Sequence, residues 1–359
     1  MHRLWVVPLG IALSIGPLGS QPTSLGGPVQ GYTFDTPTQS FRAVIGLPGS
    51  ASFGPALATG FDVGWVAPHQ NYAIGFRPGN RRRRELTVGR SATADAAIKT
   101  CFLVTGLDSN PVSTSTTGLS GQPDGIVWSG DGSVAVLYSR SGAWLQVLSG
   151  LPGAPQVGSL VDLSQLGGSL SAVATDQQGK SIALAIQSNL AVQGNLSMQS
   201  NGGGVFLSTD GQTFVSALPM AKPIALTFSG DGASLYILDG GALQLDVLAV
   251  NGYSSQNFPL DGLWDPCAIA SGRDAQGRPI VYVAGASDQI FQAYDPATQQ
   301  ALVNLPLSFQ PTGIAVLGPN SFIIYSPSKP GDPLWLFASV PQPAVYFVPA
   351  ARSVEGGLN

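Results

Sequence analysis

The chain repeats a short unit in which two runs of apolar residues flank a turn. In the clearest copy, residues 126–128 (Ile-Val-Trp) and 134–138 (Val-Ala-Val-Leu-Tyr) are separated by Ser129-Gly130-Asp131-Gly132. Both runs are short and rich in β-branched and aromatic residues, which predicts strands, and the turn residues tolerate positive φ. Neither run alternates between apolar and polar residues, as a strand with one wet face would. The pattern therefore predicts antiparallel hairpins that are covered on both faces.

Variants of this unit return through most of the chain. The closest copy spans residues 223–237, with the turn Ser229-Gly230-Asp231-Gly232. One residue in the first strand of each copy serves as an anchor, and the six anchors are Trp65, Ile126, Ala172, Ile224, Ala268 and Ile314. They lie 61, 46, 52, 44 and 46 residues apart. A period of roughly 40 to 50 residues with four strands per unit predicts an all-β chain that forms a single β-propeller of four-stranded antiparallel blades.

With these copies, the chain resembles the β-propeller repeat superfamily with NHL-, YVTN- or WD40-like blades, of the exported bacterial type. Residues 294–298 (Tyr-Asp-Pro-Ala-Thr) look like the third strand and exit turn of such a blade. The resemblance covers about residues 32–349, and it implies a fold while leaving the function open. Six anchors favour six blades. A seventh blade would have to lie in the long first or third interval or near residues 345–348.

A further copy lies near the N-terminus. Residues 34–47 align without gaps to residues 294–307, with Asp, Thr and Gln at matching positions. In the second copy these residues close a blade, so the N-terminal copy resembles outer strands that lack their own inner ones. We therefore expect the N-terminal strands to close the ring by pairing with the last C-terminal blade, which would remove an exposed sheet edge.

The first residues carry a targeting signal. A short basic region is followed by the apolar residues 4–15, which are too few to span a bilayer. We interpret residues 1–20 as a signal peptide, 21–31 as a flexible leader, 32–349 as the propeller and 350–359 as a loose tail. This predicts a secreted or periplasmic protein without a membrane span; a buried first strand is the alternative.

Composition narrows the classes of partner. The chain has 46 Gly, 28 Pro and only 10% charged residues, with a net charge of −4. An acidic net charge disfavours general binding to nucleic acid. We also expect the protein to be a monomer. The only cysteines, Cys101 and Cys267, fall in distant blades, so thiols are favoured over a disulfide.

The residue inventory argues against common catalytic sites. His69 is the sole histidine after the proposed signal peptide, and it lies in a predicted turn without a Gly-x-Ser-x-Gly sequence elsewhere. Metal-ligand spacings of His and Cys, phosphate-binding loops and calcium loops are missing from the sequence. We therefore predict no catalytic residue, no metal and no cofactor.

Two groups of residues are candidates for binding. Asp62, Asp124 and Asp265 each precede the anchor of an inner strand, which would place them at the mouth of the central channel, and Trp264 adds an aromatic wall. Alternatively, each aspartate caps its local turn. Arg81, Arg82, Arg83 and Arg84 form a patch for an anionic partner or, alternatively, a solvated hairpin tip.

These observations favour an exported, non-catalytic propeller that binds a protein or a glycan. One alternative is a propeller enzyme resembling lactonases or quinoprotein dehydrogenases, with a site at the channel mouth. The other alternative is a structural component of a cell-envelope assembly.

Overall fold

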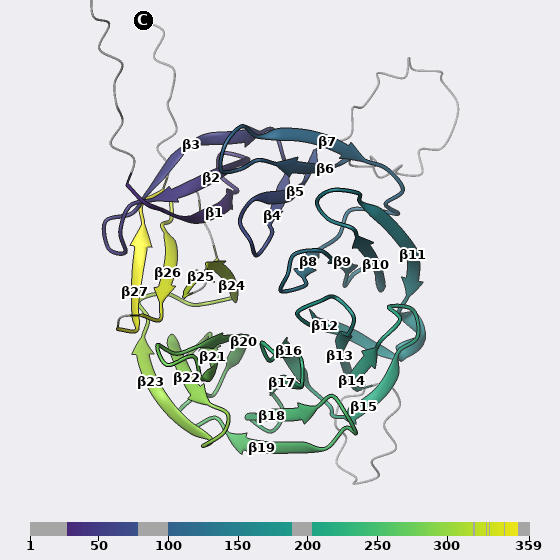
Figure 1. The fold of residues 1–359 in the computed structure, drawn as a ribbon. Helices are drawn as coiled ribbons and strands as arrows, with labels where there is room; N and C mark the ends of the chain where they lie inside the picture. The colour runs from purple at the N-terminus through teal and green to yellow at the C-terminus, as the bar shows by residue number, and fades with distance from the viewer. Residues whose placement is uncertain are drawn as a thin grey trace, which may run out of the picture.

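The computed structural model describes residues 27–77, 100–188 and 203–350, apart from 319, 328, 330 and 341. Within these residues, 27 strands form seven antiparallel sheets arranged in a ring (Figure 1). The only helical element described is a short 3-10 helix, η1 (Ser164–Leu166). No helix in the described part of the chain is long and apolar enough to cross a membrane. The all-β propeller prediction is therefore confirmed.

Each sheet is one blade, numbered in chain order. Blade 1 contains β1 (Val29–Asp35), β2 (Ser40–Ile45) and β3 (Ser52–Thr59). Blade 2 contains β4 (Val63–Val66), β5 (Tyr72–Arg77), β6 (Thr100–Thr105) and β7 (Val112–Thr116). Blade 3 contains β8 (Gly125–Trp128), β9 (Ala135–Ser139), β10 (Trp144–Ser149) and β11 (Gln156–Asp162). Blade 4 contains β12 (Gly168–Thr175), β13 (Ile182–Ser188), β14 (Gly204–Ser208) and β15 (Val215–Pro219). Blade 5 contains β16 (Pro223–Phe228), β17 (Ser234–Asp239), β18 (Gln244–Ala249) and β19 (Ser255–Pro259). Blade 6 contains β20 (Pro266–Arg273), β21 (Pro279–Gly285), β22 (Ile290–Asp295) and β23 (Gln300–Pro306). Blade 7 contains β24 (Gly313–Gly318), β25 (Ser321–Tyr325), β26 (Leu334–Ala338) and β27 (Ala344–Val348).

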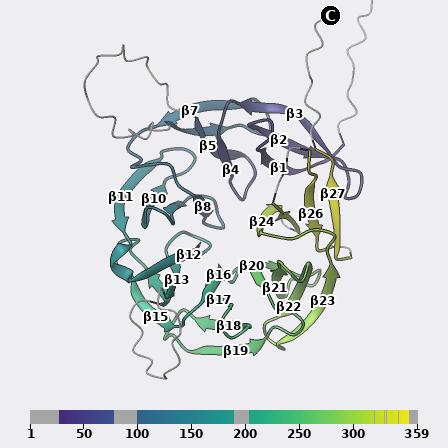
Figure 2. The same cartoon turned by 180° about the vertical axis from the view of Figure 1, so that it is seen from behind.

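In blades 2 to 7 the first strand lies nearest the channel and the fourth lies at the rim (Figure 1). All six anchor residues fall in these first strands, β4, β8, β12, β16, β20 and β24. The view from behind shows the same order, with β24–β27 beside β1–β3 (Figure 2).

The hydrophobic core is divided among the interfaces between neighbouring blades. Seven clusters of buried apolar side chains are present among the described residues, one for each pair of adjacent blades. Strand β9 shows how the sequence pattern produces them. Ala135 and Leu137 pack toward blade 2, whereas Val136 packs toward blade 4. Because successive side chains point to opposite faces, an uninterrupted apolar run serves two interfaces, and the predicted covering of both faces is confirmed.

Side chains of the inner strands also join neighbouring blades through hydrogen bonds. Ser171 Oγ in β12 donates to the carbonyl oxygen of Pro223 at the start of β16, at 2.6 Å. Ser271 Oγ, late in β20, donates to the carbonyl oxygen of Phe228 at the end of β16, at 2.8 Å. The beginnings of these strands therefore meet, as do their ends, so the strands run in the same direction. We call the face where they begin the upper face and the opposite face the lower face.

The repeated Gly-Asp-Gly turn has the conformation that its sequence predicts. Gly132 and Gly232 have φ of 70° and 72°, in the left-handed region that favours glycine. In the first copy, Asp131 Oδ1 accepts hydrogen bonds from Ser129 Oγ at 2.7 Å and from the Ser133 N–H at 2.9 Å. Each such turn joins the first two strands of a blade on the lower face.

The structure has seven blades, which the sequence allowed, although it favoured six. The seventh blade is the N-terminal sheet β1–β3, which has three strands and lies between β24 and β4. The N-terminal strands complete the ring, but their predicted pairing with the last blade is wrong. Among the described residues, blade 7 has four strands of its own, and β1 pairs with β2 alone. Strand β1 begins at Val29, within the segment 21–31 that we interpreted as a leader.

Strand β1 runs opposite to the first strands of the other blades. Gly31, near its beginning, lies against Leu317 at the end of β24, where a Cβ would come within 2.7 Å of that side chain. Phe34, near its end, lies against Gly64 in β4, with 2.9 Å between the ring and a Cβ built on Gly64. Blade 1 therefore has the strand directions of the second, third and fourth strands of a complete blade. Residues 34–47 thus fall in β1 and β2, at the second and third positions, whereas residues 294–307 fall in β22 and β23, the third and fourth strands of blade 6, so the interpretation of the N-terminal copy as blade-closing strands is displaced by one strand.

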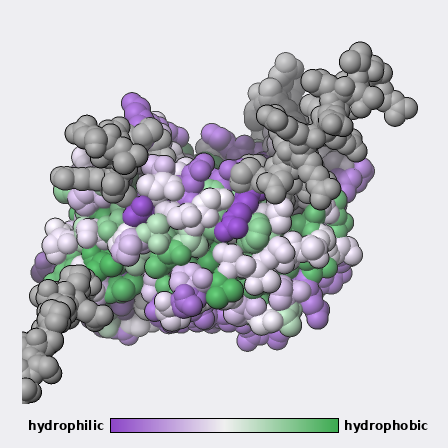
Figure 3. Space-filling model, turned by 90° about the horizontal axis from the view of Figure 1, so that it is seen from above, coloured by the Kyte–Doolittle hydropathy of each residue, from purple (hydrophilic) through white to green (hydrophobic). Residues whose placement is uncertain are grey.

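The rim carries exposed apolar side chains on its outer strands. Seen from the side, apolar residues gather along the middle of the rim and hydrophilic residues along its edges (Figure 3). Val112 in β7 and Phe347 in β27 are 54% and 55% exposed.

Candidate functional site

The three candidate aspartates lie on the upper face, in the loops that lead into inner strands. Asp62, Asp124 and Asp265 precede β4, β8 and β20, which belong to blades 2, 3 and 6. Among the described residues, no group of three or more His, Cys, Asp or Glu side chains is placed to hold a metal ion. The structure puts these residues on one face but does not gather them into one carboxylate cluster.

Asp124 fastens two parts of blade 3 together. Its Oδ2 accepts hydrogen bonds from the Arg140 N–H at 2.7 Å, from Ser139 Oγ at 3.0 Å and from the Ser141 N–H at 3.2 Å. Burial raises the pKa of Asp124, but these hydrogen bonds outweigh it and the pKa lies below the ordinary value. The carboxylate is therefore ionised and engaged by the turn between β9 and β10.

Asp265 takes part in a reciprocal arrangement in blade 6. Its Oδ2 accepts hydrogen bonds from Ser287 Oγ at 2.5 Å and from the Ser287 N–H at 3.2 Å. In the opposite direction, Asp288 Oδ2 accepts from the backbone N–H groups of Trp264 and Asp265, at 2.7 and 2.9 Å. The loop before β20 is thus held to the turn between β21 and β22 at both ends.

This clamp presents Trp264 to solvent. The neighbouring Leu263 is 1% exposed and packs in the core between blades 5 and 6, whereas Trp264 is 76% exposed. A large indole on a backbone fixed by hydrogen bonds and by a buried neighbour is a preformed surface for stacking. The sequence singled out Trp264 and Asp265, but it gave no sign that Asp288 would hold both.

The remaining sequence candidates lie elsewhere. The Asp62 N–H donates to the carbonyl oxygen of Phe76 at 2.8 Å, which extends the ladder between β4 and β5. Arg81, Arg82, Arg83 and Arg84 fall outside the described residues. His69 is exposed in the turn after β4, on the lower face and away from the three aspartates.

Both cysteines are present as thiols, in different blades. Cys101 is buried in β6, and Cys267 is half-buried in β20, where its Sγ lies 3.3 Å from the carbonyl oxygen of Ala284. Burial raises the pKa of each thiol to about 12. A thiol with such a pKa has almost no thiolate at neutral pH, which makes it a poor nucleophile.

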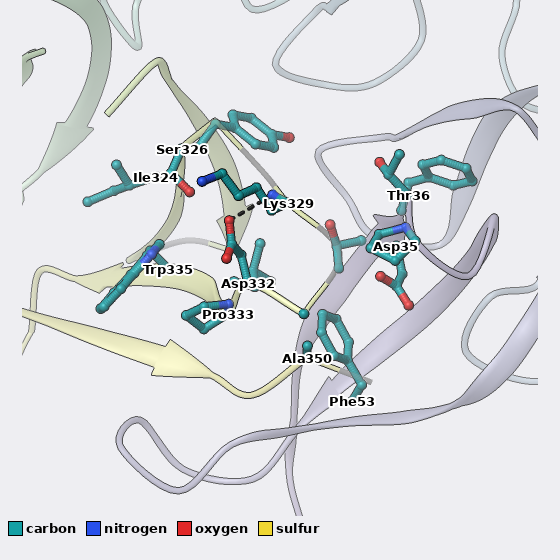
Figure 4. Close-up of a pocket in the computed structure, with 16 residues that line it drawn as sticks. Asp35, Thr36, Phe53, Ile324, Ser326, Lys329, Asp332, Pro333, Trp335 and Ala350 are labelled. Atoms are coloured by element: carbon teal, nitrogen blue, oxygen red, sulfur yellow. Dashed lines mark hydrogen bonds between the residues drawn. The ribbon is translucent and has the colours of Figure 1, made fainter. Parts of the chain in front are cut away.

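A pocket that the sequence did not predict lies between blades 7 and 1 (Figure 4). It has a volume of about 120 Å³ and is lined by aromatic side chains of both blades, among them Phe34, Phe53 and Trp335. Asp35, 7% exposed, pairs with Arg42 at 3.2 Å, so its charge is balanced. The pocket forms where distant ends of the sequence meet, so no local motif could reveal it.

The fold makes this chain a seven-bladed β-propeller. No protein-family model matches the chain, and no curated protein matches it significantly in sequence. Solved structures do resemble it. The periplasmic gluconolactonase of Pseudomonas aeruginosa is 18% identical with a TM-score of 0.53, covering 90% of this chain and 98% of its own. A functionally unknown protein from Desulfotomaculum acetoxidans is 11% identical with a TM-score of 0.53, covering 89% of this chain and 99% of its own. At such identities the likeness shows the fold alone.

Proposed function

We propose that the protein is an exported, non-catalytic scaffold that binds a protein or glycan partner on the upper face of its propeller, with Trp264 as the anchor. The observation that carries this proposal is the 76% exposure of Trp264 on a loop fixed by Asp288 and Leu263. Export is an expectation from the apolar residues 4–15.

A preformed surface loses little conformational entropy when a partner binds. Tryptophan offers a large contact area, and it dominates the energetics of many interfaces. Binding is weakened when loops must be ordered in the complex. Here the two hydrogen bonds to Asp288 fix the backbone of Trp264 and Asp265 before any partner arrives. Ordering this loop on binding therefore costs little free energy.

A lactonase is the second candidate, because a gluconolactonase shares the fold. Such an activity would have to use the carboxylates on the upper face. Asp124 and Asp265 are already bonded to the turns of their own blades, which favours a structural role for both. A structural role in a cell-envelope assembly is a third candidate, and it would use the same binding surface.

The test compares Trp264→Ala with Phe347→Ala, which removes an aromatic residue that is 55% exposed on the rim. Purified proteins are applied to a glycan array and crosslinked in envelope extracts. We expect Trp264→Ala to lose the captured glycan or protein and Phe347→Ala to keep it, with unchanged circular dichroism in both. Equal capture by both variants would contradict the proposed surface. Hydrolysis of gluconolactone that Asp124→Asn abolishes would instead support the enzyme.

A further inference from the structure

The pocket between blades 7 and 1 lies on the upper face. Strand β1 runs opposite to the first strands, so its end and the turn after it are on this face, beside the end of β25. In the close-up, Asp35 and Phe53 of blade 1 lie across the pocket from Ser326 and Asp332 of blade 7 (Figure 4). Trp264, in the loop before blade 6, is not among the described residues that line it. The pocket is therefore separate from the proposed Trp264 surface.

Asp35 brings a buried carboxylate with one unused oxygen to this pocket. Its side chain is 7% exposed, and its contacts with Thr38 Oγ1 and with Arg42 Nε, at 3.2 Å, both go to Oδ2. No other described residue donates a hydrogen bond to Oδ1. In the described part of the chain, the side-chain atoms that are both unpartnered and closed off from solvent are Arg77 Nε and Trp128 Nε1. Oδ1 is not one of them, so it can be reached from the pocket.

The aligned turn of blade 6 shows why this oxygen has no partner. There, Asp295 Oδ1 accepts hydrogen bonds from the backbone N–H groups of Ala297 and Thr298, at 2.8 and 3.4 Å. The residue that aligns with Ala297 is Pro37, and proline has no backbone N–H. The turn after Asp35 therefore lacks the donor that caps the equivalent carboxylate in blade 6.

The charges at the pocket favour a neutral ligand. Arg42 balances Asp35, and the position that aligns with Arg42 in blade 6, residue 302, is a leucine. On the side of blade 7, Lys329 and Asp332 carry opposite charges in one turn, where the Lys329 N–H donates to Asp332 Oδ2 at 2.7 Å. A cationic ligand at Oδ1 would be repelled by the guanidinium group, whereas a hydroxyl group can donate there without adding charge. Such a hydrogen bond to an ionised acceptor is stronger than one between neutral groups.

The walls are suited to a ring that carries hydroxyl groups. Phe53 packs at the interface of blades 7 and 1, and Tyr325 lines the pocket and is 45% exposed. Among the described residues, no group bonds to the Tyr325 hydroxyl, which can both donate and accept. Aromatic rings also offer apolar surface to the CH groups of a ligand. The volume of about 120 Å³ is below the roughly 150 Å³ of a cavity that holds benzene, so the pocket receives part of one ring.

We propose that this pocket binds the end of a neutral glycan. A hydroxyl group of the terminal sugar donates to Asp35 Oδ1, and the sugar ring packs against Phe53 and Tyr325. Pro37 leaves the acceptor open for this ligand. The site goes beyond the proposed function, because it does not use Trp264.

The unsubstituted protein provides the first test. Methyl glycosides of glucose, galactose and mannose are titrated into protein that carries ¹³C-labelled tyrosine, and the Tyr325 ring signal is identified by its loss in Tyr325→Phe. We expect at least one glycoside to shift this signal in a saturable way. Tetrahydropyran, which has the ring without hydroxyl groups, should leave it unchanged. No saturable shift with any of the three glycosides, or an equal shift with tetrahydropyran, would overturn the proposal.

Substitutions in the turn then test the acceptor. Asp35→Asn replaces the charged acceptor by an amide, so the affinity should fall about tenfold or more. Pro37→Ala supplies the N–H that Ala297 provides in blade 6, so Oδ1 is capped and the affinity should fall several-fold with the ion pair intact. Pro296→Ala, in the aligned turn, is the matched control and should bind as the unsubstituted protein does. Unchanged affinity in both Asp35→Asn and Pro37→Ala would refute the role of Oδ1.

Trp264→Ala separates this site from the proposed function. We expect it to bind the glycoside with unchanged affinity, because Trp264 lies outside the pocket. Loss of glycoside binding in Trp264→Ala, with retention in Pro37→Ala, would assign the sugar to the Trp264 surface and refute the pocket site. Capture of a partner that depends on Trp264, without any glycoside shift at Tyr325, would leave the proposed function standing while this proposal fails.

Discussion

The packing between blades predicts a large and specific effect of replacing Phe291. This ring lies in β22 of blade 6, is 0% exposed, and has its centroid 4.5 Å from that of Phe337 in blade 7. Truncating a fully buried phenylalanine to alanine costs about 3–5 kcal/mol, which combines lost transfer free energy with the cavity left behind. We therefore expect Phe291→Ala to lower the free energy of unfolding by that amount.

The part of this loss in the free energy of unfolding that comes from the contact between blades can be measured separately. Aromatic pairs at this separation contribute about 0.5–1.5 kcal/mol beyond their buried area. A double-mutant cycle with Phe337→Ala should give a coupling free energy in that range, because Phe291 and Phe337 belong to different sheets and meet only through side chains.

Urea and thermal unfolding, followed by circular dichroism, measure both quantities. The expected fall in Tm for Phe291→Ala is on the order of 10 °C. Phe347→Ala is the matched control, since this phenylalanine is 55% exposed and should cost about 1 kcal/mol or less. If Phe291→Ala costs no more than Phe347→Ala, or the coupling is zero, the blades are not held together by the buried clusters between them.

Three further predictions concern the loop clamp, a buried carboxyl and a buried thiol. Asp288→Ala removes the acceptor of two backbone N–H groups, so the fluorescence anisotropy of Trp264 should fall; unchanged anisotropy in a background that lacks the other tryptophans would refute the clamp. Burial, reinforced by a neighbouring aspartate, raises the pKa of Asp246 in the folded protein. The protonated carboxyl therefore stabilises the fold fully below its ordinary pKa of about 4. This stabilisation is lost as the pH rises through the raised pKa. Asp246→Asn should therefore be more stable than the unsubstituted protein at pH 7 and no more stable below about pH 4; urea unfolding with the opposite pH trend would contradict this. With its pKa raised to about 12, Cys101 should react with a disulfide reagent at pH 8 only after denaturant is added, and rapid reaction of the native protein would refute its burial.

Most of the ring could be predicted from the sequence because each hairpin carries its own signals. The apolar run around Ile126 and the turn with Gly132 are local features, and their copies gave all six first strands of blades 2 to 7. What the sequence could not supply was the place of the N-terminal copy within its blade. Gln39 and Gln299 occupy equivalent turn positions with φ of 50° and 60°. These turns join the first two strands of one sheet and the last two of another, so the match defines a turn and not a strand number.

The candidate site was predictable to a smaller extent. The spacing of Asp124 and Asp265 from the anchors predicted that both lie on the upper face. It did not predict the hydrogen-bond partners that give both aspartates a structural role. Those partners, Arg140 and Ser287, are 16 and 22 residues further along and meet the aspartates only when the hairpins form. The pocket between blades 7 and 1 depends on contacts between residues as distant as Phe34 and Trp335, for which the sequence contains no pattern.

The roles of these carboxylates bear on where a partner can bind. Asp124 and Asp265 hold the loop that precedes an inner strand to the turn between the second and third strands of the same blade. Two such clamps in non-adjacent blades indicate a common way of fixing the upper face. In both aspartates the oxygen that accepts these hydrogen bonds is Oδ2, which fixes the carboxylate against the turn. The proposed binding surface would therefore use side chains on the segments that the clamps hold in place, and Trp264 is a large aromatic residue that a clamp both fixes through its backbone and leaves exposed.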